Sequence, residues 1–501
     1  IRKSLVGSEM CIRDRDKNAS IRTPQSNLPV KAKARLCAQA SMEPTALAGM
    51  AKLDSPTVQR LGVMIFLQLI LNLGWTKYWI KCDISSAFLQ GQERDVKTKG
   101  RLFLNPPKRP LEGVPEGSLL EVVKSVYGLP DAPRAWWEEV TKFLRSLGFQ
   151  HSRMDVAFLV RYGDDGSLSA MIVLHVDDMM IAHDGSSTCK HMLEKIRNTY
   201  PMGEWTDVAS QEAGVQYTGR TVRLDGSKIK LSQSDFIHGR MDELKVPRDK
   251  NRKHTDLCTP VEHAEFRSGV GNLHWVTSQT RVDHAVNTSK LQKRQHAPTY
   301  GDLKELKKIV KEVKSTADVE LTIQPMTDPV LGAWTDSSLY GTSGELIEQD
   351  SDLEGYDKHQ IYSQGGSFLA LMPRSSLDDV NDIPFSIADW RTRASKRVLH
   401  STFAAEASAC VETLGLAKFY RAYYCDILLG HADWMDVAEF GEDHLPIVIF
   451  TDCKSLYDNL KKDGSVPDDR WVAIPIASLR GAISAGAERN RNKSEMKWVP
   501  S

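Results

Sequence analysis

The sequence has few cysteines and no cysteine pair of the kind that binds zinc. Eight occur in 501 residues, and none stands in a C-x-x-C pattern or beside a histidine cluster. Structural zinc sites and disulfide scaffolds need closer spacing or a higher density of cysteine. The pattern argues for a reducing compartment, and it leaves carboxylates as the candidate metal ligands.

Long hydrophobic runs are also missing. The longest, residues 61–73, is interrupted by Gln68 and Asn72 and is too short to span a bilayer. The N-terminal residues lack the apolar core of a signal peptide. We therefore expect an intracellular protein without a membrane partner.

The net charge is zero, but the charge is unevenly distributed. Residues 331–501 carry 17 basic and 26 acidic side chains, which leaves 48 and 39 for residues 1–330. A basic surplus favours a polyanionic partner for the larger part. The length and the 41% hydrophobic side chains predict two to four globular domains and exclude a disordered or collagen-like chain.

The first fifteen residues are treated separately. Residues 10–15, with the sequence MCIRDR, resemble a translated sequencing-library adapter, so we exclude residues 1–15 from the fold interpretation as an artefact. An ordinary polar tail is the alternative. In both cases we expect the natural N-terminus to lie outside the sequence.

Hydrophobic patterning and turn residues predict the elements that carry the acidic motifs. The expected helices are residues 57–73, 134–147 and a long helix that Ser401 caps. The expected strands are residues 79–84, 102–104, 330–335, 367–372 and 447–451. Two apolar runs, 168–176 and 179–182, predict a β-hairpin with an acidic tip. Residues 324–329 contain two prolines and predict a linker between domains.

The tip of this hairpin holds two adjacent carboxylates, Asp177 and Asp178. An exposed turn is the simplest explanation, because Asp is common in turns. However, Asp83 lies on a separate predicted strand and supplies a third carboxylate. Three carboxylates on neighbouring strands can hold two divalent ions for phosphoryl transfer.

Three ordered blocks resemble the reverse transcriptase of copia-type retrotransposons. They are DISSAFLQG at 83–91, KSVYGLPDAPRAW at 124–136 and VDD at 176–178. The similarity extends to KARL at 33–36 and to FRSGVGNL at 266–273, so it covers nearly all of residues 30–325. Three positions depart from the family pattern. His175 stands where Tyr or Phe is common, and Pro130-Asp131 stand where the family has Lys-Gln.

The resemblance implies a role for each matched residue. Asp83, Asp177 and Asp178 would form the catalytic site and hold two Mg²⁺ ions, with Mn²⁺ as the alternative ion. The residues expected to contact the incoming nucleotide are Lys33, Arg35, Ile84, Ser86, Ala87 and Phe88. Phe88 would exclude ribonucleotides by its bulk, although a plain core aromatic is an equal alternative. Arg134 would contact nucleic acid.

A second carboxylate set comprises Asp336, Glu406 and Asp452. Each alone has an ordinary explanation, such as a helix cap or a solvated side chain. Their contexts, AWTDS at 333–337, STFAAEA at 401–407 and FTDCKS at 450–455, resemble the ribonuclease H domain that follows reverse transcriptase in the same elements. The resemblance implies that these three residues are catalytic and hold two further Mg²⁺ ions. The fourth carboxylate of that family would follow residue 501.

The implied fold is an α+β right-hand polymerase, with an antiparallel-sheet palm, fingers and thumb, followed by an α/β mixed-sheet ribonuclease H-like domain. The expected ranges are 16–235 for fingers and palm, 236–325 for thumb and connection, and 330–501 for a ribonuclease H-like domain that is truncated at its C-terminus. The implied activity is RNA-directed DNA synthesis with hydrolysis of RNA in hybrids, in the cytoplasm or in retrotransposon particles. The implied partners are an RNA template, a DNA primer, RNA–DNA hybrid and dNTPs. An inactive remnant that at most binds nucleic acid and an unrelated two-metal nuclease remain as alternatives.

A predicted helix at 301–315 carries lysines at three- and four-residue steps. They are Lys304, Lys307, Lys308, Lys311 and Lys314. A solvated helix face is the common explanation. Because the segment lies between the two acidic parts of the chain, we expect these lysines to contact the phosphates of a primer–template duplex.

Overall fold

The computed structural model divides into two compact units. The first comprises Ile1–Gln59 and Trp75–Ser210, and the second comprises Arg60–Gly74 and Gln211–Ser501. The structure describes residues 10–16, 32–38, 54–96, 100–109, 111–241, 244, 251–338, 363–377, 383–395, 399, 401–430, 441–462, 467, 470–484 and 494–500. Among the helices in these ranges, none combines the length and the apolar character that crossing a membrane requires.

The first unit is built on a six-stranded sheet in which all neighbours are antiparallel. In spatial order its strands are β10 (Met202–Asp207), β3 (Trp79–Ile84), β9 (Asp178–His183), β8 (Leu168–His175), β7 (Phe158–Tyr162) and β6 (Gln150–His151). The bounds of β3 are those predicted, and β8 and β9 form the predicted hairpin. Short 3-10 turns, η1 (Trp75–Lys77) and η2 (Val208–Ser210), lie next to β3 and β10 in the chain.

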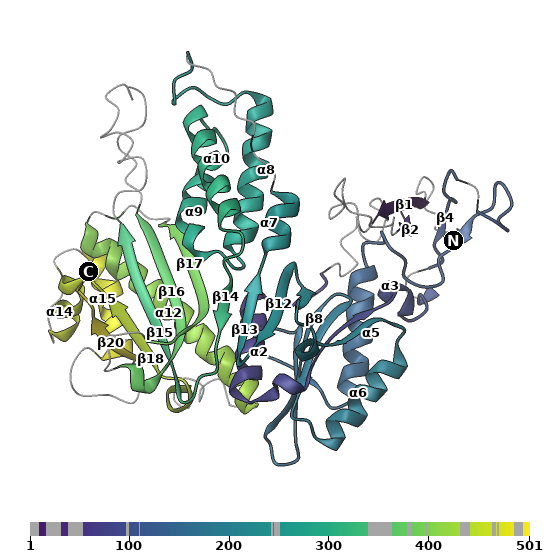
Figure 1. The fold of residues 1–501 in the computed structure, drawn as a ribbon, viewed down its shortest axis with the longest axis horizontal. Coiled ribbons are helices and arrows are strands. Elements are labelled where there is room, and N and C mark those ends of the chain that lie inside the picture. Colours follow the sequence, from purple (N-terminus) through teal and green to yellow (C-terminus); the bar gives the residue numbers. More distant parts are fainter. Residues whose placement is uncertain are drawn as a thin grey trace. The chain divides into compact units, whose positions relative to one another are not determined.

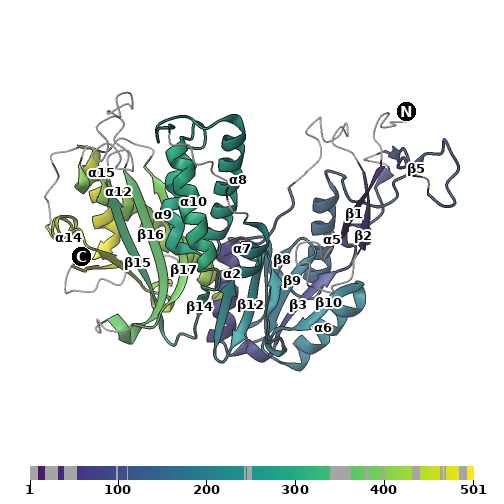
Figure 2. The same cartoon turned by 45° about the horizontal axis from the view of Figure 1, so that its top comes forward.

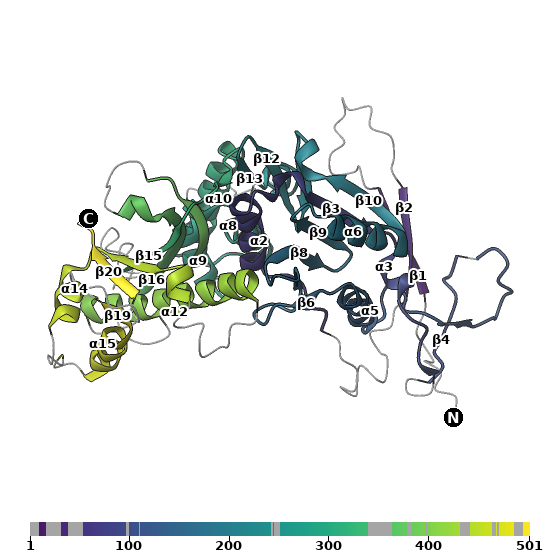
Figure 3. The same cartoon turned by 90° about the horizontal axis from the view of Figure 1, so that it is seen from below.

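Two helices cover one face of this sheet. Helix α5 (Ala132–Ser146) has a proline in its first turn, where a missing N–H is tolerated. The Ser186 hydroxyl accepts a hydrogen bond from the Cys189 N–H and so caps α6 (Ser187–Thr199). Side chains of both helices share one core with alternate residues of β3, β8 and β9. Figure 3 shows α5 and α6 beside the strands of this sheet. Because strand side chains alternate between faces, the remaining residues of these strands, Asp83 among them, face the opposite side.

Two small antiparallel sheets complete the first unit. They are β1 (Met10–Asp16) with β2 (Ala32–Ala38), and β4 (Phe103–Leu104) with β5 (Leu120–Glu121). Residues 10–15, which we excluded from the fold interpretation, therefore lie in β1. Gly128 has a φ of 90°, and a Cβ there would meet the Ala38 carbonyl oxygen at 2.0 Å, so only glycine fits beside the end of β2.

The second unit begins with α2 (Arg60–Asn72), which is buried throughout residues 61–71. Its two buried or half-buried amide side chains, Gln68 and Asn72, are hydrogen-bonded within the unit. Gln68 Nε2 donates to Asn72 Oδ1 at 2.8 Å and to the Gln324 carbonyl at 2.9 Å. An antiparallel sheet follows, formed in order by β11 (Val215–Tyr217), β12 (Arg220–Asp225), β13 (Lys228–Ser232) and β14 (Leu321–Ile323).

Among the described residues, the α-helices between β13 and β14 share one apolar core. They are α7 (Ser234–Arg240), α8 (Pro260–Thr277), α9 (Ala285–Lys293) and α10 (Tyr300–Ser315), with η3 (Val282–His284) before α9. Capping boxes start α8 at Thr259 and α10 at Thr299, which satisfies two backbone N–H groups at each end. Figure 2 shows α8, α9 and α10 side by side.

The last part of the second unit is a mixed six-stranded sheet. Its order is β17 (Ser386–Ala394), β16 (Gln364–Pro373), β15 (Pro329–Ser338), β18 (Ile447–Thr451), β20 (Ser494–Trp498) and β19 (Ile483–Ser484). Strands β17 and β15 each pair antiparallel with β16, and β15, β18, β20 and β19 run parallel. The remaining elements are η4 (Arg374–Leu377), α12 (Thr402–Leu429), α14 (Lys454–Lys461) and α15 (Arg470–Ala482). Helix α12, capped by Ser401 as predicted, lies along β15 and β16 (Figure 1).

Candidate functional site

The first carboxylate set lies at one end of the antiparallel sheet. The register of β3 and β9 places Asp83 directly opposite Asp178, and directly opposed residues have Cβ atoms about 5 Å apart. Asp177 occupies the turn between β8 and β9, and its carbonyl accepts the Ile84 N–H at 3.0 Å. The two sequence blocks that carry these carboxylates therefore meet at one place.

A buried lysine contacts this set. Lys81 Nζ lies 3.0 Å from Asp178 Oδ1 and 2.6 Å from Glu204 Oε2 of β10. Burial lowers the pKa of Lys81, but hydrogen bonds to Glu204 and Asp178 and their charges raise it more, so the pKa lies above its ordinary value. Burial raises the pKa of Asp178, and the charges of Asp83 and Asp177 add to this against the opposing effect of Lys81. The negative charge of these carboxylates is therefore incompletely neutralised by Lys81. Carboxylate oxygens are ligands that suit hard divalent ions such as Mg²⁺ or Mn²⁺.

Strand β10 reaches the site through a bulge. The pairing with β3 shifts between Met202 and Glu204, so that Glu204 lies opposite Asp83. A Cβ on the intervening Gly203 would come within 2.8 Å of Asp83 Oδ2 and of Ser85 Oγ. Glycine at this position therefore leaves room for the Asp83 carboxylate.

The hairpin turn is held by a tryptophan of α5. Val176 has a φ of 62°, a strained value for a β-branched residue. The buried Trp136 donates from Nε1 to the Val176 carbonyl at 2.8 Å. This bond fixes the backbone immediately before the two hairpin carboxylates.

We expect Trp136→Phe to lower the free energy of unfolding by about 1–3 kcal/mol, because the Val176 carbonyl loses its donor. Urea unfolding measures the loss. Trp137→Phe is the control, since Trp137 Nε1 has no hydrogen-bond partner within the described part of the chain. Equal losses in the two variants would show that the hydrogen bond does not hold the turn.

An aromatic residue that the sequence interpretation missed connects the nucleotide-binding candidates. The Arg35 guanidinium lies 4.9 Å from the centre of the Tyr127 ring, and the Phe88 ring lies 5.0 Å from it. Burial raises the pKa of Tyr127, opposed by Arg35 and reinforced by the charges of Asp177 and Asp83. Its place within KSVYGL of the second block was the only signal that could have identified it.

The other nucleotide-binding candidates follow β3. Ile84 ends the strand, and Ser86 adopts a φ of 54° at the start of the short helix α3 (Ala87–Gln90). Phe88 packs partly buried against two apolar cores, which is compatible with either role considered above. Lys33 and Arg35 both lie in β2.

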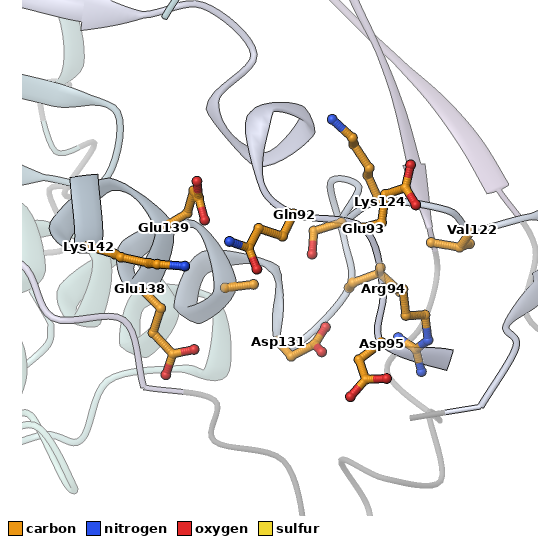
Figure 4. A pocket seen from close by; sticks show the side chains of 13 residues that line it. Gln92, Glu93, Arg94, Asp95, Val122, Lys124, Asp131, Glu138, Glu139 and Lys142 are labelled. Atoms are coloured by element: carbon orange, nitrogen blue, oxygen red, sulfur yellow. The ribbon is translucent and has the colours of Figure 1, made fainter. Parts of the chain in front are cut away.

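Asp131, where the sequence departs from the family pattern, and the nearby Arg134 both lie among residues of the first unit. Asp131 is 8% exposed and lines a pocket of about 400 Å³ between residues 92–95 and α5 (Figure 4). Carboxylates outnumber basic groups in its lining, which does not suit a triphosphate. Arg134 donates to Asp54 at 2.9 Å and to Glu138 at 2.7 Å, and it stacks on Trp137.

The second carboxylate set converges in the mixed sheet. Asp336 lies within β15, two residues before its end at Ser338 rather than at the predicted strand end, and Asp452 directly follows the parallel strand β18. Glu406 projects from the first turns of α12. One carboxylate oxygen from each of the three lies within 4.8 Å of the others, so the structure brings these residues together.

Glu406 is the buried member of this set, with 7% of its surface exposed. Its Oε1 accepts the Ser337 N–H at 3.1 Å, and its Oε2 has no hydrogen-bond partner among the described residues. Burial raises the pKa of Glu406 to about 7, and the charges of Asp336 and Asp452 add to this while Ser337 opposes it. An orphaned buried oxygen within three carboxylates fits a divalent cation.

One further group of potential ligands is His183, Asp184 and Cys189. Its atoms are already used locally. His183 Nδ1 accepts the Gly185 N–H at 3.0 Å, and Cys189 Sγ donates to the Ser169 carbonyl at 3.5 Å. We therefore assign this group to local hydrogen bonding at the start of α6.

The five predicted lysines of α10 divide into two kinds. Lys304 Nζ lies 4.2 Å from the Tyr300 ring centre, and Lys314 Nζ donates to the Met241 carbonyl at 3.0 Å. Lys307, Lys308 and Lys311 are exposed. These three are the part of the predicted stripe that faces solvent.

Part of the chain, including the β8–β9 hairpin, is similar to known proteins. Residues 21–257 match a family model described as reverse transcriptase (RNA-dependent DNA polymerase). The chain is 23% identical over 340 residues to the retrovirus-related Pol polyprotein from transposon RE2 of Arabidopsis thaliana, which covers 66% of this chain and 22% of that protein. It is 22% identical over 406 residues to the corresponding polyprotein from transposon TNT 1-94 of Nicotiana tabacum. This alignment covers 74% of this chain and 27% of that protein.

The chain thus spans about a quarter of the length of these relatives. A Saccharomyces cerevisiae relative, the transposon Ty1-DR4 Gag-Pol polyprotein, is 27% identical over 207 residues. The matched range of the family model includes β3 with Asp83 and the β8–β9 hairpin with Asp177 and Asp178. Together these matches support a copia-like retrotransposon polyprotein with a reverse transcriptase domain.

Proposed function

We propose that this chain is an RNA-directed DNA polymerase that acts at Asp83, Asp177 and Asp178 and also hydrolyses RNA in RNA–DNA hybrids at Asp336, Glu406 and Asp452. In this proposal the antiparallel sheet of the first unit is the palm, and β1, β2, β4 and β5 belong to the fingers. Helices α7 to α10 form the thumb and connection, and the mixed sheet with α12 is the ribonuclease H-like domain.

The observation that carries the polymerase proposal is the β3–β9 register. It sets Asp83 against Asp178 beside the Asp177 turn, within residues that match the reverse transcriptase family. Two divalent ions, when bound, would favour loss of the primer 3′-OH proton and stabilise the pyrophosphate leaving group. The carboxylates of Asp83 and Asp177 would hold these ions.

Residues around the carboxylates would orient the incoming nucleotide. The N–H groups of Ser86 and Ala87 lie at the start of α3, and they would donate to phosphate oxygens. Arg35 and Lys33 would neutralise phosphate charge. The Ile84 carbonyl lies next to Asp83 in the chain and would face the same site.

Sugar selection is assigned to Phe88. We expect Phe88→Val to lower the preference for dNTPs over rNTPs about ten-fold or more, because a ribose 2′-OH no longer clashes with the ring. Single-nucleotide incorporation measures the ratio. Phe143→Val alters another partly buried aromatic of the same core and should leave the ratio unchanged. An unchanged ratio in Phe88→Val as well would assign Phe88 to packing alone.

The carboxylate triad carries the hydrolase proposal. Divalent ions, when bound there, would activate water and stabilise the leaving 3′-oxygen of the RNA strand. Glu406 would position its orphaned Oε2 toward such an ion, while its Oε1 stays fixed by the Ser337 N–H. Asp336 and Asp452 would supply the exposed ligands.

Exposed lysines of α10 are proposed to contact the nucleic-acid backbone. Replacing Lys307, Lys308 and Lys311 by Gln should weaken duplex binding for every sequence and flatten the slope of log K against log salt by about two to three units. The control replaces three exposed lysines of other elements, which are Lys190, Lys195 and Lys228. If both triple variants changed the slope alike, α10 would have no special part in binding.

The proposed function is tested by dNTP incorporation on an RNA template annealed to a DNA primer, with Mg²⁺ and then with EDTA. The expected result is extension that EDTA abolishes, together with shortening of the RNA strand. Binding of the duplex without incorporation would favour the inactive-remnant alternative.

A further inference from the structure

Lys81 lies among three carboxylates at the candidate polymerase site. Its side chain is 7% exposed, and its ammonium bridges Asp178 Oδ1 and Glu204 Oε2 at 3.0 and 2.6 Å. Glu204 Oε1 is further held by the Thr206 hydroxyl at 3.1 Å. The lysine is therefore fixed between two strands that flank β3.

The sheet register places these groups on one face. Glu204, Asp83 and Asp178 lie opposite one another on β10, β3 and β9, and directly opposed residues share a face. Lys81 is two residues from Asp83 on the same strand and shares that face. The bulge at Gly203 is required for this arrangement, because it sets Glu204 rather than Gly203 opposite Asp83.

The charges explain why the arrangement matters. A buried ammonium is costly unless carboxylates pair with it, and a row of carboxylates is costly without a cation. Lys81 offsets part of the charge of Asp178 and Glu204 before any metal ion binds. It also holds the Asp178 carboxylate, whose Oδ1 lies 3.0 Å from its ammonium nitrogen.

The geometry points to Lys81 as an internal cation and positioning residue of the site. It holds Asp178 in a supporting role, leaves Asp83 and Asp177 as the direct metal ligands, and weakens the binding of free divalent ions. This inference rests on the proposed function for the location of the metal site. It predicts that loss of the lysine charge strengthens metal binding, whereas a purely structural lysine would leave metal affinity unchanged or lower it.

The test measures Mn²⁺ binding to the full chain by electron paramagnetic resonance, in the absence of nucleic acid and dNTPs. All proteins carry Asp336→Asn and Asp452→Asn, so that the second carboxylate set does not contribute. Lys81→Met should bind Mn²⁺ about ten-fold more tightly, since one positive charge is removed within a few ångströms of the ion. Lys81→Arg should remain near the parent affinity, and Lys195→Met, at an exposed lysine of α6, should match the parent.

Glu204→Gln provides a second variant that does not leave a buried charge unpaired, because Lys81 keeps Asp178. It should weaken Mn²⁺ binding several-fold. Unchanged or weaker Mn²⁺ binding in Lys81→Met, or the absence of Mn²⁺ binding that Asp83→Asn removes, would overturn the inference. Because the assay needs no catalysis, failure of primer extension would refute the proposed function while leaving this result intact.

Discussion

Primer extension by the Asp83→Asn variant is expected to fall by about three orders of magnitude or more. Asn keeps the shape of the side chain but removes the charge that would hold a divalent ion beside the primer terminus. Asp83 also faces Asp178 across the sheet, where like charges destabilise the pair. The variant should therefore be at least as stable as the parent in the absence of metal.

This combination separates a catalytic effect from a folding defect. Single-turnover incorporation and urea unfolding are measured on the same preparation. Asp164→Asn removes an exposed carboxylate from the β7–β8 turn of the same sheet and should leave both quantities unchanged. Near-parental extension by Asp83→Asn would remove this residue from the site.

The second large effect is expected at Glu406. Glu406→Gln should lower hydrolysis of the RNA strand about a hundred-fold or more, because the neutral amide is a poor ligand for a divalent ion. The same variant should be more stable than the parent at pH 8 without metal. Ionised Glu406 is buried beside two other carboxylates, which repel it, whereas the Gln amide of the variant carries no charge.

The direction of the pH effect follows from the raised pKa. Glu406 has an ordinary pKa of 4.5 and a folded-state pKa of about 7, so the folded state binds more protons between these values. The stability of the parent should therefore fall as pH rises from 4.5 through 7, by on the order of 3 kcal/mol. Glu406→Gln should lack this fall. Glu412→Gln, on the exposed side of the same helix, is the control, and a parental pH profile in Glu406→Gln would contradict the assigned burial of the charge.

The elements that carry the carboxylates could be predicted because local pattern dominates them. The apolar strand at β3, the paired runs of β8 and β9, and β18 show a clear periodicity, and the structure has these elements. Ser401 is a favourable cap, and it starts α12. The convergence of Asp336, Glu406 and Asp452 followed from resemblance to a family whose topology was already known.

The network around Lys81 could not be predicted in the same way. Strand β10 lies far from β3 in sequence, and a one-residue bulge decides which of its side chains faces Asp83. Pairing register depends on tertiary context, so neither Lys81 nor Glu204 stood out. The lysines of α10 were predicted as one stripe, but Lys304 and Lys314 have partners that only the packing of neighbouring segments provides.

The most direct test of the central claim compares the parent chain with Asp177→Asn on one RNA template and DNA primer, in Mg²⁺ with all four dNTPs. The account predicts templated extension by the parent and none by the variant, at equal occupancy of the primer–template. Extension by both proteins, or by neither when both bind the duplex, would contradict it.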